Sequence, residues 1–315
     1  MPVADTVVQA SPGKVVEVTL GGQQGRKGVT VGGETALPFL TFEGVIPHRP
    51  TIAVDVEDRE PVSWPSNVRN AWGAAAKDPA TWASAAVAAG ADLIALTLAT
   101  THPDQENASP ASAVETVRRV LAAVDVPLIV YGPGVAAKDN DVLVAVAEAT
   151  SGLNLALGVC EDKNYRTIVA ACLASGHVAI AKSPIDLNLA KQLNILIADM
   201  GLPTERTLMD PTTGALGYGI EYTYSVMERL RLAALQGDRW CGLPMVCTPG
   251  YEAWRQKESR AADGVPAEWG AFERRGILWE ATTASTLLQA GADILVMRHP
   301  RAIALVRGAI DKLMG

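Results

Sequence analysis

Eight short apolar runs constrain the fold of this chain more than any other feature of its sequence. Val, Ile, Leu and Ala fill nearly every position of each run, rather than every second position. Strands of a parallel sheet that is covered on both faces have this composition. The runs are TIAVDV (51–56), DLIALTL (92–98), VPLIVYG (126–132), NLALGV (154–159), HVAIAK (177–182), RTLMD (206–210), LPMVCT (243–248) and DILVM (293–297).

Helical patterns separate these runs. One apolar face, for example, contains Ile185, Leu189, Leu193, Leu196 and Met200, which recur at helical spacing. The segments AAGADLIAL (88–96) and QAGADILVM (289–297) also share one join, in which a glycine ends a helix and Ala-Asp leads into a strand. The shared join indicates a repeated strand–helix unit.

Eight such units predict an α/β fold of the (β/α)8 TIM-barrel type. We expect a single domain over 1–315, with the barrel over 51–315. The segments KVVEVTL, GGQQGRKG and VTVGG predict a β-hairpin over 14–33 in front of it. A doubly wound sheet is the competing topology, but it usually carries GxGxxG after its first strand, and none follows Val56.

The overall composition narrows the function. The formal net charge is −7 at pH 7, which argues against binding to nucleic-acid phosphates or to an anionic membrane surface. No apolar run reaches 18 residues, and the first residues do not resemble a secretory leader. The four cysteines show no CxxC spacing, which is typical of a reducing compartment. We therefore expect a cytoplasmic protein without a membrane or nucleic-acid partner.

Three connections that follow strands are long, namely 57–80, 211–220 and 248–273. In a TIM barrel all three lie at the C-terminal end, where ligands bind. They carry seven aromatic residues, which either pack as a small satellite core or meet a ligand or partner. These residues are Trp64, Trp72, Tyr218, Tyr222, Tyr251, Trp254 and Trp269.

Two stretches in these connections are candidate binding segments. DPTTGALGYG follows the sixth strand, and its glycines would let backbone N–H groups approach a flat ligand. It can equally be a tight strand–helix turn. CTPGYEAWRQKE (247–258) follows the seventh strand and places Tyr251 and Trp254 on one helical face. That face can line a ligand or an interface, or it can belong to a capping helix.

The sequence contains no convincing catalytic or metal-binding pattern. The four histidines (His48, His102, His177 and His299) form no HxH, HExxH or DxHxxG motif, although His299 follows the eighth strand and can face a ligand. Lys182 ends the fifth strand, where a lysine can form a Schiff base as in class I aldolases or simply pair with an anion. A rich upper rim without an evident catalytic group favours binding over turnover.

Several long blocks resemble one family. They are GGETALPFLTFEG, KSPIDLNLAKQLNILI, DPTTGALGYGIEYTYSVMERLRLAALQGD, CTPGYEAWRQKE and ERRGILWEATTASTLLQAGADILVMRHP. Together they are similar to the small subunit of the corrinoid iron–sulfur protein of the reductive acetyl-CoA pathway, whose archaeal relative is the delta subunit of acetyl-CoA decarbonylase/synthase. The similarity covers most of the chain.

This resemblance implies a TIM barrel that pairs with a large subunit as a heterodimer. The large subunit would hold the [4Fe–4S] cluster, with none in this chain, and the two subunits would share a cobalamin-type corrinoid. The pair would take a methyl group from methyltetrahydrofolate through a methyltransferase and deliver it to acetyl-CoA synthase. A cap on such a cofactor should be apolar, should hydrogen-bond the amide side chains of the corrin, and should offer the cobalt no His, Cys or Lys.

The resemblance also implies which residues face the corrinoid. The first group is Asp210, Thr212, Thr213, Gly214, Gly217, Tyr218, Gly219 and Tyr222, and the second group is Thr248, Gly250, Tyr251 and Trp254. No catalytic residue and no metal ligand is assigned. Two positions depart from the family pattern, because Arg301 stands where an acidic residue is expected and Lys182 where an arginine is expected.

Two enzyme functions stay open. A stand-alone pterin-binding TIM-barrel methyltetrahydrofolate methyltransferase would use Asp210, Asn188 and Asp55 to hold its substrate. A Schiff-base aldolase would use Lys182. Unlike either enzyme, the carrier subunit needs a second, cluster-bearing chain.

Overall fold

The computed structural model describes residues 8–315 and contains a closed barrel of eight parallel strands. The strands follow one another around the barrel in chain order, and β10 pairs with β3 to close it. They are β3 (Thr51–Glu57), β4 (Leu93–Thr97), β5 (Leu128–Tyr131), β6 (Ala156–Cys160), β7 (Val178–Lys182), β8 (Thr207–Asp210), β9 (Met245–Cys247) and β10 (Ala292–Met297). Each coincides with one of the eight apolar runs, so the predicted TIM barrel is confirmed.

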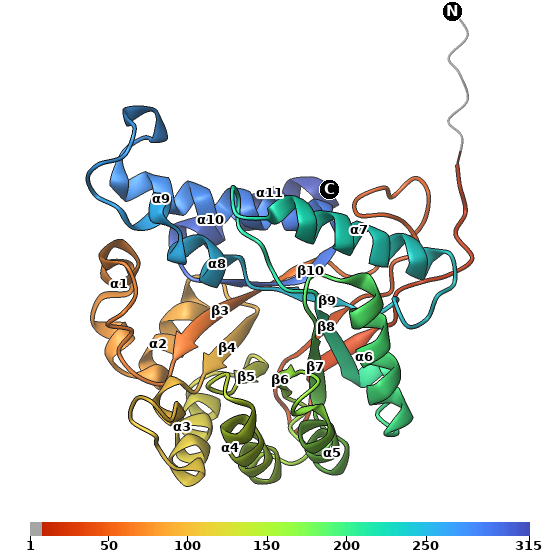
Figure 1. Ribbon diagram of the computed structural model, residues 1–315, viewed down its shortest axis with the longest axis horizontal. Helices are drawn as coiled ribbons and strands as arrows, with labels where there is room; N and C mark the ends of the chain where they lie inside the picture. The colour runs from red at the N-terminus through yellow and green to blue at the C-terminus, as the bar shows by residue number, and fades with distance from the viewer. Residues whose placement is uncertain (1–7) are drawn as a thin grey trace, which may run out of the picture.

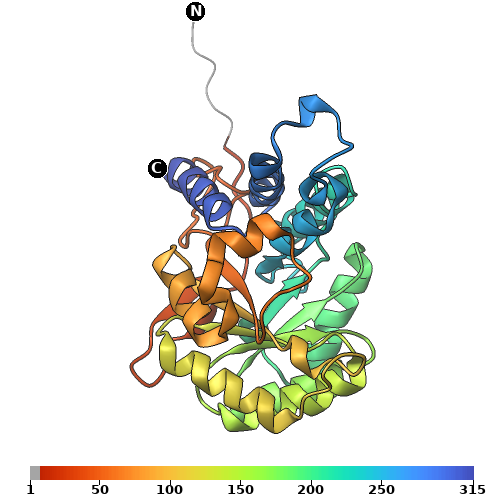
Figure 2. The same cartoon turned by 90° about the vertical axis from the view of Figure 1, so that its left-hand side faces the viewer.

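Helices surround the strands on the outside of the barrel (Figures 1 and 2). Those that follow the strands in sequence are α2 (Pro79–Ala88), α3 (Pro110–Ala123), α4 (Ala136–Ala149), α5 (Tyr165–Ser175), α6 (Leu187–Asp199), α7 (Ile220–Leu235), α10 (Phe272–Gln289) and α11 (Pro300–Met314). On α6 the predicted apolar face is correct except at Leu189, which is 45% exposed near the start of the helix.

Additional short helices occur mainly in the long connections. They are α1 (Ser66–Trp72) and η1 (Gly73–Lys77) before α2, and α8 (Pro249–Arg255), α9 (Lys257–Arg260) and η4 (Ala267–Trp269) before α10. Two further 3-10 turns are η2 (Ala99–Thr101) and η3 (Thr204–Arg206). Helix α8 packs against α10 and β10, so the connection after β9 forms part of the barrel's upper wall (Figure 1).

The apolar core has two layers. One lies between the strands and the helices, and the other fills the barrel itself with strand side chains such as Leu93, Ile129, Ile180 and Ile294. None of the helices in residues 8–315 combines the length and the apolar character that a bilayer crossing requires.

The predicted N-terminal hairpin is also present. Strands β1 (Val18–Gly21) and β2 (Gly28–Val31) pair antiparallel, and their buried residues Val18, Leu20 and Val31 join the core inside the barrel. Arg26 in the hairpin turn donates to the carbonyl of Leu121 at 2.9 Å, which fastens the turn to α3. The hairpin therefore covers the N-terminal end of the barrel.

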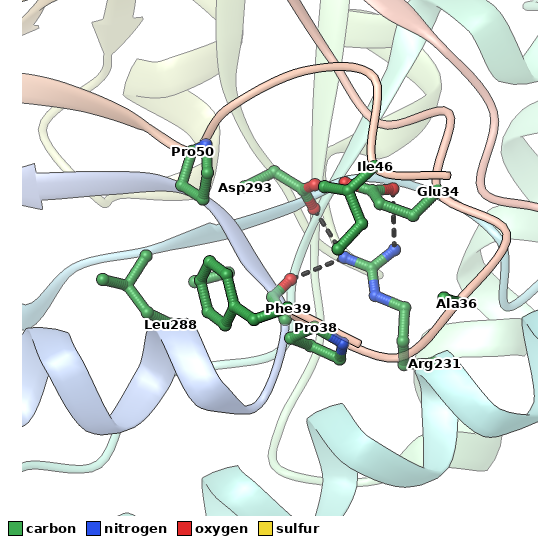
Figure 3. Close-up of a pocket in the computed structure, with 11 residues that line it drawn as sticks. Glu34, Ala36, Pro38, Phe39, Ile46, Pro50, Arg231, Leu288 and Asp293 are labelled. Atoms are coloured by element: carbon green, nitrogen blue, oxygen red, sulfur yellow. Dashed lines mark hydrogen bonds and ion pairs between the residues drawn. The ribbon is translucent and has the colours of Figure 1, made fainter. Parts of the chain in front are cut away.

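A buried ion cluster fastens the segment after the hairpin to the barrel wall (Figure 3). Arg231 of α7 donates to a carboxylate oxygen of Asp293 at 2.7 Å, and Glu34 lies 3.8 Å away on the other side of the guanidinium. Asp293 also accepts the backbone N–H of Met245 at 2.6 Å. Burial, with the negative charge of Asp293 beside it, raises the pKa of Glu34 to about 8. The cluster thus joins α7, β9, β10 and the N-terminal segment.

Candidate functional site

The C-terminal end of the barrel, called here the barrel mouth, holds a cavity of about 260 Å³. The strands, or the residues that directly follow them, supply its walls around the whole barrel. The lining residues are Asp55, Glu57, Thr97, Tyr131, Gly132, Pro133, Gly134, Gly158, Val159, Lys182, Asp210, Thr248, Tyr251, Val296 and Arg298. Ligand sites of TIM barrels form at this end.

Arg298 and Asp55 form an ion pair in the wall of this cavity. Two guanidinium nitrogens of Arg298 lie 2.8 Å from one carboxylate oxygen of Asp55, and Thr97 donates to the other oxygen at 3.2 Å. The Arg298 guanidinium also stacks on Trp64, 3.8 Å from the ring centre, and lies 5.2 Å from the ring of Tyr251. These contacts fix the position of Arg298 at the wall.

Asp210 is buried at the end of β8. One of its oxygens accepts the backbone N–H of Thr212 at 2.9 Å. Burial raises the pKa of Asp210, although the positive charge of Lys182 opposes the shift. Lys182 and Asp210 are register partners on β7 and β8, so their side chains share one face of the sheet. The cavity therefore contains an ionisable pair of opposite sign.

The resemblance implied an apolar cap, but the cavity below the rim is lined by charged groups. Asp55, Glu57, Lys182, Asp210 and Arg298 all line the cavity. Only the rim above them, formed by Tyr218, Tyr222 and Tyr251, is aromatic and exposed: these side chains are 46%, 66% and 48% exposed. Lys182 in particular places an ammonium group in a cavity that, as a corrinoid cap, should offer no lysine.

The glycine-rich stretch after β8 is held mainly by its own hydrogen bonds. Thr212 has a positive φ of 62° and donates to the carbonyl of Ser183 at 2.5 Å. The backbone N–H of Gly214 donates to Thr223 at 2.8 Å, and a side chain on Gly214 would stand only 2.6 Å from the carbonyl oxygen of Gly219. Gly214 is thus required by the turn, as the structural alternative proposed.

The outer part of this stretch forms the exposed rim. Gly217 and Gly219 adopt φ values of 75° and 90°, and Gly219 precedes the first turn of α7, which carries Tyr222. The hydroxyl of Tyr218 donates to Glu258 of α9 at 2.9 Å. Tyr218 therefore connects the rim to the neighbouring connection while one side of its ring stays accessible.

The second predicted group divides in the same way. Thr248 and Tyr251 line the cavity, and the backbone N–H of Thr248 donates to the hydroxyl of buried Thr213 at 2.8 Å. Gly250 lies against β10, where an added side-chain carbon would stand 2.8 Å from the nitrogen of Arg298. Trp254 is buried beneath this layer, so its ring does not reach the mouth surface.

Trp254 belongs to a buried cluster with Glu280 and His299. Its indole donates to Glu280 at 2.6 Å, and its ring stacks on His299 with 5.7 Å between the ring centres. Burial raises the pKa of Glu280 to about 7 and lowers the pKa of His299 to about 4. His299 accepts the N–H of Arg301 at the start of α11 and does not line the cavity.

Only some of the seven loop aromatics pack as the predicted satellite core, and the others are exposed. Trp64, Trp72 and Trp254 are buried, and Trp64 and Trp72 pack on Trp82. Tyr218, Tyr222, Tyr251 and Trp269 are exposed. Asn188, proposed for the pterin enzyme, is exposed at the start of α6 and is not a cavity-lining residue.

Among the lining residues with polar or ionisable side chains, the sequence analysis assigned no role to Glu57, Thr97, Tyr131 and Arg298. Each is the last residue of its strand or directly follows it. That position is the signal that could have found them, because it points to the mouth in every barrel strand. Across residues 8–315, no three or more His, Cys, Asp or Glu side chains are grouped so as to hold a metal ion.

The fold and the site define a TIM-barrel protein with a charged cavity below a tyrosine rim. The family model of the CO dehydrogenase/acetyl-CoA synthase delta subunit matches residues 17–307. The acetyl-CoA decarbonylase/synthase complex subunit delta of Methanopyrus kandleri is 38% identical over 306 residues, covering 95% of this chain and 75% of that protein. The subunit of the same name from Archaeoglobus fulgidus is 38% identical, covering 96% and 69%. The chain therefore belongs to the CO dehydrogenase/acetyl-CoA synthase delta subunit family.

Solved structures of dihydropteroate synthase share the fold. The Yersinia pestis enzyme in a sulfonamide drug complex superposes with a TM-score of 0.56 at 14% identity, covering 86% of this chain and 96% of that chain. The Xanthomonas albilineans enzyme in complex with 7,8-dihydropteroate gives 0.56 at 13% identity, covering 88% and 98%. At this identity the likeness confirms the barrel and carries no function.

Proposed function

We propose that this chain is the small subunit of a heterodimeric corrinoid iron–sulfur methyl carrier, and that its barrel mouth caps the corrinoid. Family membership supports the proposal, because the relatives are named as delta subunits of the acetyl-CoA decarbonylase/synthase complex. The large subunit would hold most of the corrinoid and the [4Fe–4S] cluster. A methyltetrahydrofolate methyltransferase and acetyl-CoA synthase would be the donor and acceptor partners in the cytoplasm.

The tyrosine rim is the observation that carries this proposal. Tyr218, Tyr222 and Tyr251 expose about half or more of their side chains at one end of the barrel. The neighbouring Gly217 and Gly219 have positive φ values and no side chain that would stand between the tyrosines and a ligand. Exposed aromatic groups of this kind mark contact surfaces. A flat ligand fringed with amides fits them, because a tyrosine offers an apolar ring together with a polar hydroxyl.

The residues present fit a corrinoid cap in a second respect. No histidine and no cysteine lines the cavity, although Lys182 does, and all four cysteines are buried as free thiols. When bound, the corrinoid supplies a cobalt ion that accepts and releases the methyl group. This chain's own contribution would be to cover one side of the macrocycle, hydrogen-bond its amide side chains through Tyr218, Thr248 and Tyr251, and exclude water there.

The experiment is co-expression with the large subunit, followed by gel filtration and visible spectroscopy. Changing Tyr222 or Tyr251 to Glu should lower the corrinoid retained per heterodimer, because a carboxylate would be desolvated beneath the macrocycle. Phe42→Glu is the matched control, since Phe42 is 55% exposed and belongs to the N-terminal segment rather than to the mouth. Unchanged cobalt absorbance and elution in both tyrosine variants would refute the proposed cap.

A further inference from the structure

The cavity below the rim has polar groups that a flat cap does not require. A cap needs a surface, whereas this cavity of about 260 Å³ extends below Tyr251 to the ends of the barrel strands. Charged and hydroxyl-bearing side chains line it, and burying such groups is unfavourable unless each finds a partner. The occupant can be inferred from which groups the protein already satisfies.

Three of the charged groups are already partnered. The guanidinium of Arg298 neutralises Asp55 at 2.8 Å. Glu57 accepts the indole N–H of Trp64 at 2.6 Å and lies 3.7 Å from Arg59. Asp55 and Arg298 form the wall and need nothing from a ligand, whereas Glu57 keeps one buried carboxylate oxygen without a hydrogen-bond partner among residues 8–315.

Besides that oxygen of Glu57, three groups retain unused hydrogen-bonding capacity. Lys182 forms no hydrogen bond and no ion pair with residues 8–315, and it acts on Asp210 and Glu252 only through its charge. The hydroxyl oxygen of Tyr131 is buried and has no hydrogen-bond partner in that range. Asp210 uses one oxygen for the N–H of Thr212, and its other oxygen accepts no hydrogen bond from the described part of the chain. All three line the same cavity, from β5, β7 and β8.

The balance of these groups defines the chemistry of the occupant. Lys182 and Tyr131 offer donors, because burial and the negative charges of Asp210 and Asp55 raise the pKa of the Tyr131 phenol and keep it protonated. Asp210 offers an acceptor. A free anion would be repelled by the carboxylates of Asp55, Glu57 and Asp210. A free cation would be repelled by Lys182 and Arg298. A neutral group with a strong acceptor beside an N–H donor satisfies all three.

We propose that the mouth cavity binds a carboxamide or lactam group, with the carbonyl oxygen accepting from Lys182 and Tyr131 and the N–H donating to Asp210. The inference deepens the proposed function where the amide is a side chain of the capped macrocycle. The inference is independent of the proposed corrinoid cap where the amide belongs to a free lactam heterocycle. Both sources present the same amide carbonyl and N–H groups, and an experiment can distinguish them.

The primary test uses nicotinamide and nicotinate, which share a ring but differ as amide and carboxylate. The full chain is titrated with each and followed by saturation-transfer NMR. We expect nicotinamide to bind in about the millimolar range, as suits so small a ligand, and nicotinate to bind about tenfold more weakly because of the nearby carboxylates. Tighter binding of nicotinate, or no binding of nicotinamide, would overturn the proposal.

Variants locate the binding. Tyr131→Phe and Lys182→Met should each weaken nicotinamide binding about five- to tenfold, because each removes one hydrogen bond to the amide. Tyr224→Phe and Lys191→Met are matched controls, since Tyr224 lines an outer groove of α7 and α10, and Lys191 of α6 pairs with Asp238. Equal affinity in Tyr131→Phe, Lys182→Met and the controls would place the amide elsewhere and reject the site.

Competition separates the two sources. Dicyanocobinamide, which carries the amide side chains of a corrin, displaces nicotinamide if the native occupant is an arm of the macrocycle. 6-Methylpterin, a planar lactam, displaces it if the native occupant is a free heterocycle. Displacement by either supports the amide site, and displacement by neither contradicts it. The nicotinamide titration contains no corrinoid, so its failure is distinguishable from failure of the cap.

Discussion

Arg298 and Asp55 form a buried ion pair at 2.8 Å across the seam where β10 meets β3 and the barrel closes. The two residues are far apart in the sequence, at the last strand and the first strand of the barrel. Their pairing neutralises two charges inside the mouth and holds Arg298 against the face of Trp64. The barrel seam and the wall of the site are therefore stabilised by the same contact.

Breaking this pair should be costly. We expect Arg298→Met to lower the free energy of unfolding by about 3 to 5 kcal/mol, because it leaves Asp55 buried without its cation. Adding Asp55→Asn should recover part of that loss, which urea unfolding of the two variants will show. Arg255→Met is the control, since Arg255 and Glu252 form a more exposed pair on α8 and the expected change is at most about 1 kcal/mol. A loss from Arg298→Met no larger than the control's would contradict the assigned role.

The Arg231 cluster should make stability depend on pH. The folded chain holds the proton of Glu34 up to about pH 8, whereas the unfolded chain releases it near 4.5. The unfolded state thus binds fewer protons between these values, so stability should fall as pH rises through that window. We expect Glu34→Gln to remove about 3 kcal/mol of this fall, measured by chemical unfolding at several pH values.

Glu115→Gln is the control for that experiment, because Glu115 is exposed on α3. It should leave the pH profile unchanged. A remaining fall in Glu34→Gln is expected up to about pH 7, since burial raises the pKa of Glu280 to about 7. A profile of Glu34→Gln that parallels the parent's from pH 5 to 8 would show that Glu34 titrates normally.

Replacing two glycines by alanine should change the stability of the fold in opposite directions. An added methyl at Gly250 would stand 2.8 Å from the nitrogen of Arg298, so Gly250→Ala should destabilise the fold by about 1 to 3 kcal/mol. Gly308 lies inside α11 with no neighbouring atom within 4 Å of the added carbon. Gly308→Ala should stabilise the fold by about 0.5 to 1 kcal/mol. Thermal unfolding of both variants tests the pair, and a stabilised Gly250→Ala would refute the close packing of α8 on β10.

Thr213 should control the local stability of the site. Its hydroxyl accepts the N–H of Thr248 and so joins the connection after β8 to the one after β9. Thr213→Val leaves that N–H without an acceptor, at a cost of about 1 to 3 kcal/mol. Hydrogen exchange of the Thr248 amide should become faster, while Thr286→Val on the outside of α10 should leave it unchanged. Unaltered exchange in Thr213→Val would show that the two connections are held by other contacts.

The barrel could be predicted because each strand is apolar on both faces. In TIAVDV, for example, Ile52, Val54 and Val56 face the helix layer while Ala53 faces the barrel interior, and both faces are buried. That pattern depends only on local sequence. Leu189 departs from its predicted face because it lies in the first turn of α6, where an apolar residue at helical spacing need not contact the barrel.

The site was only partly predictable, since its polar groups are contributed by different strands. Asp210 ends an apolar run and was recognised, but Tyr131 and Arg298 sit beside apolar residues and become partners of the cavity only after the barrel closes. The burial of Trp254 also depends on a distant residue, because Glu280 on α10 accepts its indole. Periodicity along one segment does not contain such contacts between segments.

The hairpin at the N-terminal end of the barrel limits how small molecules can reach the mouth cavity. Val18, Leu20 and Val31 pack against the side chains inside the barrel, so the barrel is closed at its N-terminal end. A ligand of the mouth cavity must therefore enter and leave past Tyr218, Tyr222 and Tyr251. A partner that docks over these tyrosines would also control the residence time of that ligand. A shortened chain beginning after Gly33 would lose that closure and expose interior side chains such as Ile129 and Ile294 to water.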